Sequence, residues 1–383
     1  MNKHHSPTRR RICLAAGALL ASAPMRAMAQ DEDLDDHAAG RAALDAALDA
    51  SRVRHGVPAM GAVVLRGARI LYLGVAGQRS VTDDTPVARD ASWHLGSNTK
   101  AMTALVMARL VDRGVLSWDA ALGDVWPDVN DAWRGVLITD LLHHRAGLMD
   151  RGLIDVSWLM SARQDERSLP EQRAAFARAA LGAPPAAEPG AFAYGNANYL
   201  VAGAALEQIT GMPWEALMAD ELFAPLGITT GGFGAPSGEA SPLGHRAVGE
   251  TLAPVEADHP GSDNPRALGP AGTAHMSLAD YAKVLAIFAD EGQTHISAAS
   301  RTRLMTSYAG EERDYALGWL WLRERRWAEG AALAHEGSNT LWHTFAALSP
   351  RSGLAVAVCA NAGGPGAAAC QGLGQSLIQT FAA

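Results

Sequence analysis

Lysine is the scarcest charged residue in the chain, and one lysine has the spacing to act on a serine. The sequence holds only Lys3, Lys100 and Lys283 among 32 lysines and arginines. Arginine keeps its proton in a protein, whereas a buried lysine can lose it. Lys100 follows Ser97 by three residues, and positions i and i+3 share one face of a helix. The pair therefore fits a serine nucleophile with an amine base, at a helix N-terminus that would favour negative charge on the serine.

Two further motifs contain groups that would complete such chemistry. A capping serine followed by a solvated lysine also explains the first pair, so that motif alone is weak. Tyr194-Gly195-Asn196 stands in a glycine- and proline-flanked loop, where a phenol could relay a proton and an amide could hold a carbonyl. A turn tyrosine beside a capping asparagine is the structural alternative. His335-Glu336-Gly337-Ser338 ends an expected strand, where the glycine admits a substrate and the next N–H can serve an oxyanion.

The periodicity of apolar residues predicts the elements that position these motifs. Helices are expected over 34–55, 101–112 (closed by Gly114), 197–210 and 278–290, and over the last residues from about 367 to 381. Thr139 and Ser277 are the expected N-caps of helices over 140–144 and 278–290. Strands are expected over 61–65 and 70–77, and again over 315–322, 331–335, 344–348 and 354–360, with a turn at 350–353.

Strands at both ends of the chain and helices between them predict an α/β (α+β) fold. We expect one antiparallel sheet built from both chain ends and flanked by helices, with a mainly helical subdomain inserted. The α/β part would cover about 30–90 and 277–383, and the helical part about 91–276. A cleft at the seam between the two parts would hold the active site.

The first 29 residues predict a secretory signal peptide, which leaves 30–383 as the catalytic domain. They hold Thr8-Arg9-Arg10-Arg11, an apolar run over 14–23, and Ala27-Met28-Ala29. The expected location is the periplasm or the medium; the paired arginines suggest twin-arginine export, with the general secretory route as the alternative. No later run is apolar for long enough to predict a membrane anchor.

Charge and cysteine content narrow the choice of partners and cofactors. Without the leader the chain has 27 basic and 40 acidic residues, a net charge of −13, which argues against nucleic acid and anionic membranes as partners. Cys359 and Cys370 could form a disulfide in an oxidising compartment, or stay as two buried thiols. No metal or cofactor is expected: His335-Glu336 begins like a zinc-binding H-E-x-x-H motif, but position 339 is asparagine. The chain also lacks the G-x-S-x-G motif of the α/β-hydrolases.

Together, the three motifs resemble those of the penicillin-recognising serine hydrolases. The pattern is S-x-x-K, then Y-x-N about a hundred residues later, then H-x-G near the end of the chain. The flanking sequences are similar to the branch that includes class C β-lactamases, DD-peptidases and esterases. The resemblance extends over nearly the whole mature chain, and the segments that match most clearly are 93–100, 138–148, 224–228 and 335–361.

The resemblance implies a role for each residue of the motifs, and structural roles for His144 and Arg145. The implied roles are nucleophile for Ser97, general base for Lys100, proton shuttle for Tyr194, oxyanion-hole N–H groups for Ser97 and Ser338, and substrate binding for Asn196, His335, Glu336 and Gly337.

The third motif departs from the β-lactamase pattern. His335 stands where those enzymes have lysine, and Glu336 where they have threonine or serine. We expect Glu336 to point toward the place of a substrate carboxylate and to repel it, unless the side chain turns into solvent or pairs with an arginine.

The predicted function is therefore an exported serine hydrolase that forms an acyl-enzyme on Ser97 and cleaves esters or amides. The expected partner is a small-molecule or peptide substrate, and the sequence does not indicate an oligomeric state. Two alternatives stay open: a genuine class C-like β-lactamase or DD-carboxypeptidase, and a sensor module that has lost turnover.

Overall fold

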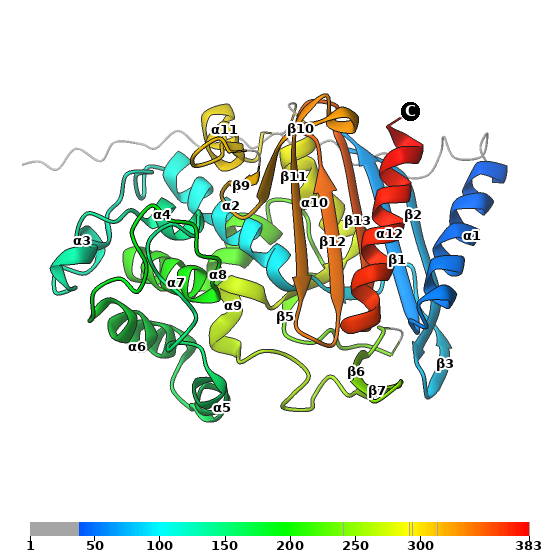
Figure 1. Cartoon of the computed structure of the whole chain (residues 1–383), viewed down its shortest axis with the longest axis horizontal. Helices are drawn as coiled ribbons and strands as arrows, with labels where there is room; N and C mark the ends of the chain where they lie inside the picture. The colour runs from blue at the N-terminus through cyan, green and yellow to red at the C-terminus, as the bar shows by residue number, and fades with distance from the viewer. Residues whose placement is uncertain (1–37, 240, 291, 293, 312, 383) are drawn as a thin grey trace, which may run out of the picture.

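An eight-stranded antiparallel sheet runs through the centre of the computed structural model, which describes residues 38–382 except 240, 291, 293 and 312 (Figure 1). The strand order is β3-β2-β1-β13-β12-β11-β10-β9. The first strand therefore pairs with the last: Met60 lies opposite Ala360, and Arg66 lies opposite Leu354. This arrangement confirms the predicted fold, a sheet assembled from both ends of the chain.

The strands fall into one large sheet and two small ones. The large sheet contains β1 (Ala59–Arg66), β2 (Arg69–Ser80), β3 (Asp83–Pro86), β9 (Arg313–Tyr315), β10 (Leu320–Arg325), β11 (Gly330–Ser338), β12 (His343–Leu348) and β13 (Leu354–Ala360). The small sheets contain β4 (Ser92–His94), β8 (Ala274–Ser277) and β5 (Gly232–Phe233), and the hairpin of β6 (Gly244–Val248) and β7 (Thr251–Val255).

Most of the helices belong to the segment between the two groups of strands. They are α1 (Ala38–Arg54), the 3-10 turn η2 (Gly96–Asn98), α2 (Thr99–Asp112), α3 (Leu122–Val125), η3 (Asp131–Trp133), α4 (Ile138–Leu142), α5 (Val156–Gln164), α6 (Leu169–Leu181), α7 (Asn196–Thr210), α8 (Trp214–Met218), η4 (Ala219–Phe223), η5 (Arg266–Leu268), α9 (Gly269–Gly272), α10 (Leu278–Ala289), α11 (Ala298–Met305), η6 (Arg326–Ala328) and α12 (Gly364–Phe381).

Helices cover both faces of the sheet, which explains the apolar run of β13. All seven residues from Leu354 to Ala360 are buried. Alternate residues of a strand point to opposite faces, so each face of β13 needs its own cover. On one face α1 and α12 pack against β1, β12 and β13, and on the other face α10 packs against β1 and β13 (Figure 1). Ser97, Lys100 and His335 lie on the α10 side, where η2 and the start of α2 meet the sheet.

Two local predictions are wrong. The single strand expected over 315–322 is split into β9 and β10, because Ala316 N–H donates to Trp319 O across a tight turn. Thr139 is not an N-cap: α4 begins at Ile138, two residues before the expected start at 140, and the Asp140 carboxylate accepts the N–H of Leu137. Ser277 does cap α10, since its hydroxyl accepts the N–H of Asp280.

Cys359 and Cys370 are separate, buried thiols. Cys359 Sγ lies 3.3 Å from the hydroxyl of Thr344, which donates its one hydrogen to His94 O at 2.9 Å, and burial raises the pKa of Cys359 to about 12. The structure therefore corresponds to the second of the two expected states. The predicted signal peptide, 1–29, lies outside the described residues. None of the helices that the structure describes is both long and apolar enough to cross a membrane.

Candidate active site

Ser97 and Lys100 meet at the start of α2, as the spacing predicted. Ser97 lies in η2, directly before the helix, and Lys100 in the first turn points its amine back along the same face. Lys100 is fully buried, and its Nζ donates to Ser97 Oγ at 2.9 Å. The same amine donates to Asn196 Oδ1 at 2.8 Å and to Ala271 O at 2.7 Å. The first and second motifs are therefore directly joined through Lys100.

Asp150, which no sequence motif indicated, fixes the orientation of the Asn196 side chain. Asn196 is the first residue of α7, and its Nδ2 donates to Asp150 Oδ2 at 3.3 Å. Asp150 Oδ1 accepts the N–H of Ala197 at 2.8 Å, which satisfies a free donor at the helix start. A carboxylate can only accept hydrogen bonds, so Asp150 binds the nitrogen of the Asn196 amide. The amide oxygen therefore faces Lys100. Asp150 lies two residues after the end of the matched segment 138–148, and this proximity was the available signal.

Two glycines allow the segments of Ser97 and Ser338 to touch. Gly96 has a φ of +51°, and a Cβ on it would lie 2.4 Å from Ser338 N. A Cβ on Gly337 would lie 2.0 Å from Leu95 O and 2.7 Å from Ser97 N. Any side chain at either position would force η2 and β11 apart. The structure therefore brings together the two backbone segments whose N–H groups were expected to form the oxyanion hole.

The ring of Tyr194 stands over the amine of Lys100. Nζ lies 5.1 Å from the ring centroid, and the tyrosine is 46% exposed. On its inner side the ring packs on His144, with centroids 4.4 Å apart. His144 is fully buried among aromatic rings, and its pKa is well below the ordinary value because of this burial and then the charge of Lys100. Its position supports the structural role expected for it.

His335 faces the site as a neutral imidazole with both ring nitrogens in use. Nδ1 lies 2.7 Å from Glu336 O, a carbonyl that can only accept, so Nδ1 carries the proton. Nε2 then accepts from the hydroxyl of Tyr315 at 2.8 Å. Burial, and secondly the charge of Lys100, lowers the pKa of His335 to about 3. Tyr315 is a second site residue that was not predicted, because it belongs to none of the motifs and was assigned only as the first residue of the expected strand over 315–322.

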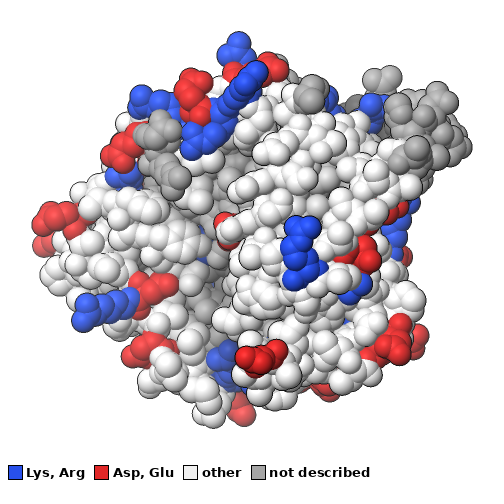
Figure 2. All heavy atoms as spheres, turned by 45° about the vertical axis from the view of Figure 1, so that its right-hand side comes forward, with Lys and Arg blue, Asp and Glu red and all other residues white. Residues whose placement is uncertain are grey.

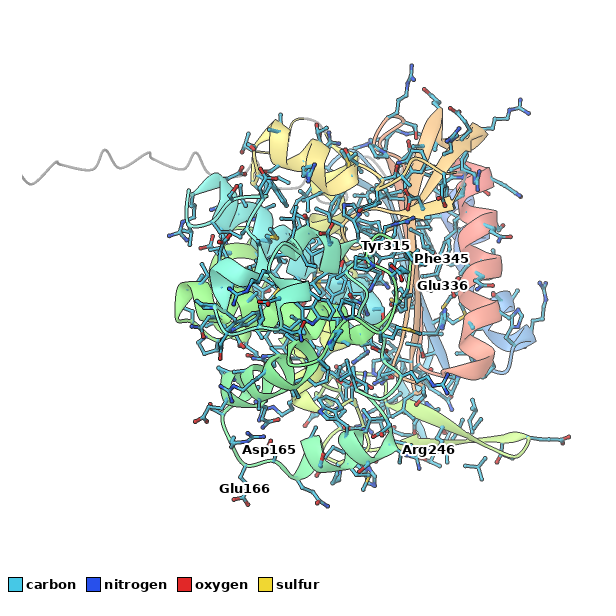
Figure 3. All side chains as sticks on the ribbon, turned by 60° about the vertical axis from the view of Figure 1, so that its left-hand side comes forward. Asp165, Glu166, Arg246, Tyr315, Glu336 and Phe345 are labelled. Atoms are coloured by element: carbon cyan, nitrogen blue, oxygen red, sulfur yellow. The ribbon has the colours of Figure 1, made fainter. Side chains whose placement is uncertain are left out.

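Glu336 does not face the site, contrary to the expected position of its side chain. Along β11 it pairs with Phe345 of β12, and both side chains lie on the α12 face of the sheet (Figure 3). Its carboxylate lies 3.1 Å from His343 Nε2 and accepts from Gln371 Nε2 of α12 at 2.7 Å. The hydrogen bond with His343 is the main cause that lowers the pKa of the Glu336 carboxyl. The alternation of side chains along a strand sends His335 to one face and Glu336 to the other.

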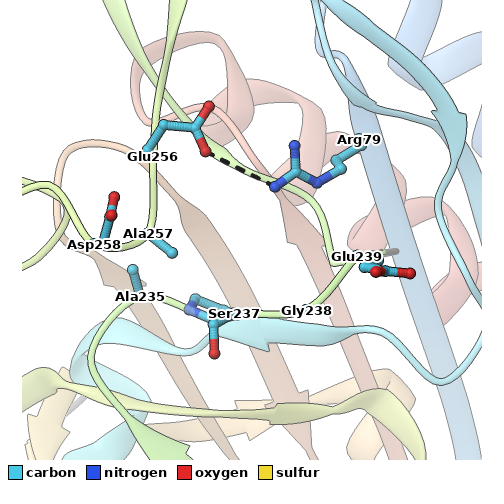
Figure 4. A pocket seen from close by; sticks show the side chains of 9 residues that line it. Arg79, Ala235, Ser237, Gly238, Glu239, Glu256, Ala257 and Asp258 are labelled. Atoms are coloured by element: carbon cyan, nitrogen blue, oxygen red, sulfur yellow. Dashed lines mark ion pairs between the residues drawn. The ribbon is translucent and has the colours of Figure 1, made fainter.

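A cavity of about 570 Å³ lies away from these residues (Figure 4). Its lining includes Arg79, Ser237, Glu256 and Asp258, and none of the predicted site residues. Arg79 is committed to ion pairs with Asp83 at 3.1 Å and Glu256 at 3.9 Å. The described residues hold no group of three or more His, Cys, Asp or Glu side chains that could bind a metal ion.

Comparison with known proteins shows a sequence family and a shared fold. Residues 36–377 match the family model described as Beta-lactamase. Penicillin-binding protein 4 of Amycolatopsis lactamdurans is 26% identical over 342 residues, which cover 82% of this chain and 84% of the relative. Esterase EstB of Burkholderia gladioli is 32% identical over 216 residues, which cover 52% of this chain and 53% of the relative.

Solved structures with a similar fold include the octameric penicillin-binding protein homologue from Pyrococcus abyssi. It superposes with a TM-score of 0.72 at 21% identity, covering 89% of this chain and 77% of its own. At this level of identity the similarity shows the fold alone.

Proposed function

Since the chain belongs to the beta-lactamase family of serine hydrolases, we propose that it hydrolyses uncharged carboxylic esters through an acyl-enzyme on Ser97. Ser97 Oγ attacks the ester carbonyl carbon while Lys100 takes the hydroxyl proton. The proton passes from Lys100 through Tyr194 to the departing alcohol oxygen as the ester C–O bond breaks, and the Ser97 acyl ester remains. Water then attacks the acyl carbon and gives up one proton, through Tyr194 and Lys100, to Ser97 Oγ, while its hydroxyl stays on the released carboxylic acid.

The observation that carries this proposal is the state of His335. In the lysine form of the third motif, the family resemblance implies that an ammonium and a hydroxyl hold a substrate carboxylate. Here the residue at that place is neutral, and Tyr315 and the Glu336 carbonyl occupy its two nitrogens. It therefore offers a carboxylate neither a charge nor a free donor. A β-lactam or a peptide C-terminus would lose that attraction, whereas an uncharged ester would lose nothing.

Aromatic side chains at the edge of the site support an apolar substrate. Only three aromatic side chains are exposed in the described part of the chain: Phe192, Tyr194 and Tyr308. The guanidinium of Arg145 lies 5.8 Å from the ring of Phe192 and 4.8 Å from that of Tyr308, and pairs with Asp314 at 2.8 Å. Its charge is therefore already balanced. Exposed apolar surface gathered beside a nucleophile suits an apolar part of a ligand.

On the face drawn in Figure 2, uncharged side chains cover most of the area, and acidic and basic side chains lie intermixed where they gather. The relative named as an esterase agrees with the proposal, and its match covers about half of each chain.

The nucleophile is tested by covalent labelling. A fluorophosphonate probe should label the protein once, on the peptide that contains Ser97, and Ser97→Ala should abolish both the label and turnover. Labelling of Ser338 or of another serine would overturn the assignment. A label that forms slowly, in a protein without turnover of any substrate, would favour the sensor alternative.

The substrate class is tested on one panel: p-nitrophenyl esters, D-amino-acid anilides and nitrocefin. We expect the neutral esters to have the highest kcat/KM. Faster hydrolysis of nitrocefin would favour a β-lactamase, and faster hydrolysis of the anilides would favour a D-peptidase.

We also propose that the enzyme is exported after removal of residues 1–29. N-terminal sequencing of the exported form should begin at Gln30, and Arg9→Lys with Arg10→Lys should block export by the twin-arginine route. An exported form that begins at Met1 would contradict the signal peptide.

A further inference from the structure

A buried histidine holds the backbone just before the nucleophile. His94 ends β4, is 1% exposed, and its Nδ1 accepts the N–H of Gly96 at 3.1 Å. Since Nδ1 accepts, the ring proton of the neutral imidazole is on Nε2. Gly96 directly precedes Ser97, whose N–H is one of the two proposed oxyanion donors. The position of His94 therefore controls where that donor lies.

One carboxylate contacts this histidine and also the segment of the second donor. Asp263 Oδ1 lies 2.9 Å from His94 Nε2; the N–H does not point straight at the oxygen, so the contact is mainly electrostatic. The same oxygen accepts from Asn339 Nδ2 at 2.8 Å. Asn339 follows Ser338, and its Oδ1 accepts the N–H groups of Leu341 and Trp342 at 3.1 Å, which fixes the turn after β11.

We propose that Asp263 is a positioning residue that holds both halves of the oxyanion hole in register. Through His94 it fixes the segment of Ser97, and through Asn339 it fixes the segment of Ser338. The three residues come from separate parts of the chain and touch no reacting atom. This inference rests on the proposed acyl-enzyme chemistry, because it assigns a task to the two N–H groups that chemistry uses.

The folding cost of the arrangement points to a task beyond stability. Asp263 is 9% exposed, and its Oδ2 is buried and accepts no hydrogen bond from the described residues. A buried carboxylate with an unpartnered oxygen destabilises the fold. The carboxylate holds the segments of two hydrogen-bond donors, the N–H groups of Ser97 and Ser338. Both donors must point at the substrate carbonyl oxygen, on which negative charge develops during the reaction. Loss of one such donor lowers kcat by ~10²- to 10³-fold, so its displacement should cost somewhat less.

The test compares Asp263→Asn and Asn339→Ala with Asp280→Asn. Asp280 is the control, because it is also a buried aspartate, 4% exposed, and its carboxylate accepts the backbone N–H groups of Thr229 and Thr230 and pairs with Lys283, none of which belongs to η2 or β11. Each purified variant is assayed with p-nitrophenyl acetate, and its affinity for phenylboronic acid is measured, because boronic acids add to a serine as a tetrahedral anion. Thermal unfolding gives the stability of each variant.

We expect Asp263→Asn and Asn339→Ala each to lower kcat and boronate affinity by roughly 10- to 100-fold with little change in KM. Asp280→Asn should lose stability but keep both kcat and boronate affinity. If Asp263→Asn does not fold, Asn339→Ala decides alone. Unchanged kcat and boronate affinity in the folded variants would overturn the inference. If the wild-type enzyme neither hydrolyses the ester nor accepts a fluorophosphonate, the proposed function fails instead.

Discussion

All three hydrogens of the Lys100 ammonium have an acceptor in the structure. Two of the acceptors, Asn196 Oδ1 and Ala271 O, cannot give a proton back, whereas the third, Ser97 Oγ, can. Loss of one proton from the amine would therefore leave its lone pair directed at the serine hydroxyl, with the other two hydrogen bonds intact. This geometry explains why a chain that uses arginine almost everywhere has a lysine at this position.

Replacement of this amine should remove the base without removing the charge. Lys100→Arg keeps a cation but cannot supply a neutral nitrogen, so we expect ester hydrolysis to fall by at least ~10²-fold. The matched control is Lys283→Arg, because Lys283 donates to Asp280 Oδ1 and Gly227 O. That variant should keep normal kcat/KM. Near-normal hydrolysis by Lys100→Arg would mean that Lys100 acts only as a fixed charge.

The choice between neutral and carboxylate-bearing substrates should depend on His335 and not on Glu336. Opposite charges ~4 Å apart attract by ~1 kcal/mol in water and by ~4 kcal/mol at a half-buried site. We therefore expect His335→Lys to raise the kcat/KM of nitrocefin relative to a neutral ester by a factor between several-fold and ~10³.

Glu336→Thr is the control for this comparison, because Glu336 contacts His343 and Gln371 on the other face of the sheet. The structure thus reverses the expectation from sequence that this change would improve nitrocefin hydrolysis. If Glu336→Thr raises the ratio and His335→Lys does not, the assignment of selectivity to His335 is wrong.

At the scale of elements, the start of α7 serves both the fold and the site. Asp150 accepts the N–H of Ala197 there and, with its other oxygen, orients the Asn196 amide toward Lys100. A carboxylate at a helix N-terminus also interacts favourably with the helix dipole. The same side chain therefore stabilises the helix and sets the position of a group at the active site.

Asp150→Ala should reduce stability by ~1 kcal/mol, as loss of an N-terminal cap does, and should also lower kcat for esters by roughly tenfold. Asp155→Ala is the matched control, because Asp155 caps α5 by accepting the N–H of Trp158. Chemical denaturation and ester kinetics of both variants separate the two effects. Equal stability losses with unchanged kcat in both would leave Asp150 with a purely structural role.

Elements with a strong apolar period were predictable, and those that depend on one turn or one cap were not. The range 354–360 matches β13 because every side chain of that strand is buried on one face or the other. The break between β9 and β10 depends on a turn at 316–319 whose residues read as apolar strand. The error over Thr139 has a similar cause: the Asp140 side chain competes for the same helix end, and only the backbone geometry decides between them.

At the scale of the whole molecule, the site is assembled where the helical segment meets strand β11 of the sheet. The residues to which the proposed function assigns the chemistry, Ser97, Lys100, Tyr194 and His335, were identified from sequence because they belong to short motifs. Their supporting contacts from Asp150, Asp263 and Tyr315 were not, because a single polar residue far away in sequence leaves no periodic or spacing signal. Such contacts follow only from the three-dimensional packing.

The buried histidines should make the whole fold sensitive to acid. Burial lowers the pKa of His335 to about 3, and that of His143 and His295 to about 4. In the unfolded chain each imidazole takes up a proton near pH 6.5. Between these values the unfolded state binds more protons than the folded state, so stability is full above pH 6.5 and is lost as the pH falls toward the folded pKa. At pH 5, 1.5 units below the unfolded value, each histidine should cost the fold about 2 kcal/mol.

Urea unfolding at pH 7.5 and pH 5 measures this loss, and His295→Gln isolates one contribution to it. His295 lies between α10 and α11 and does not contact the residues of the site. The variant should lose ~2 kcal/mol less than the wild type between the two pH values. His259→Gln is the control, because His259 is exposed and should leave the difference unchanged. An equal loss in the wild type and in His295→Gln would show that this imidazole is protonated in the folded protein at pH 5, and that its burial does not contribute to acid sensitivity.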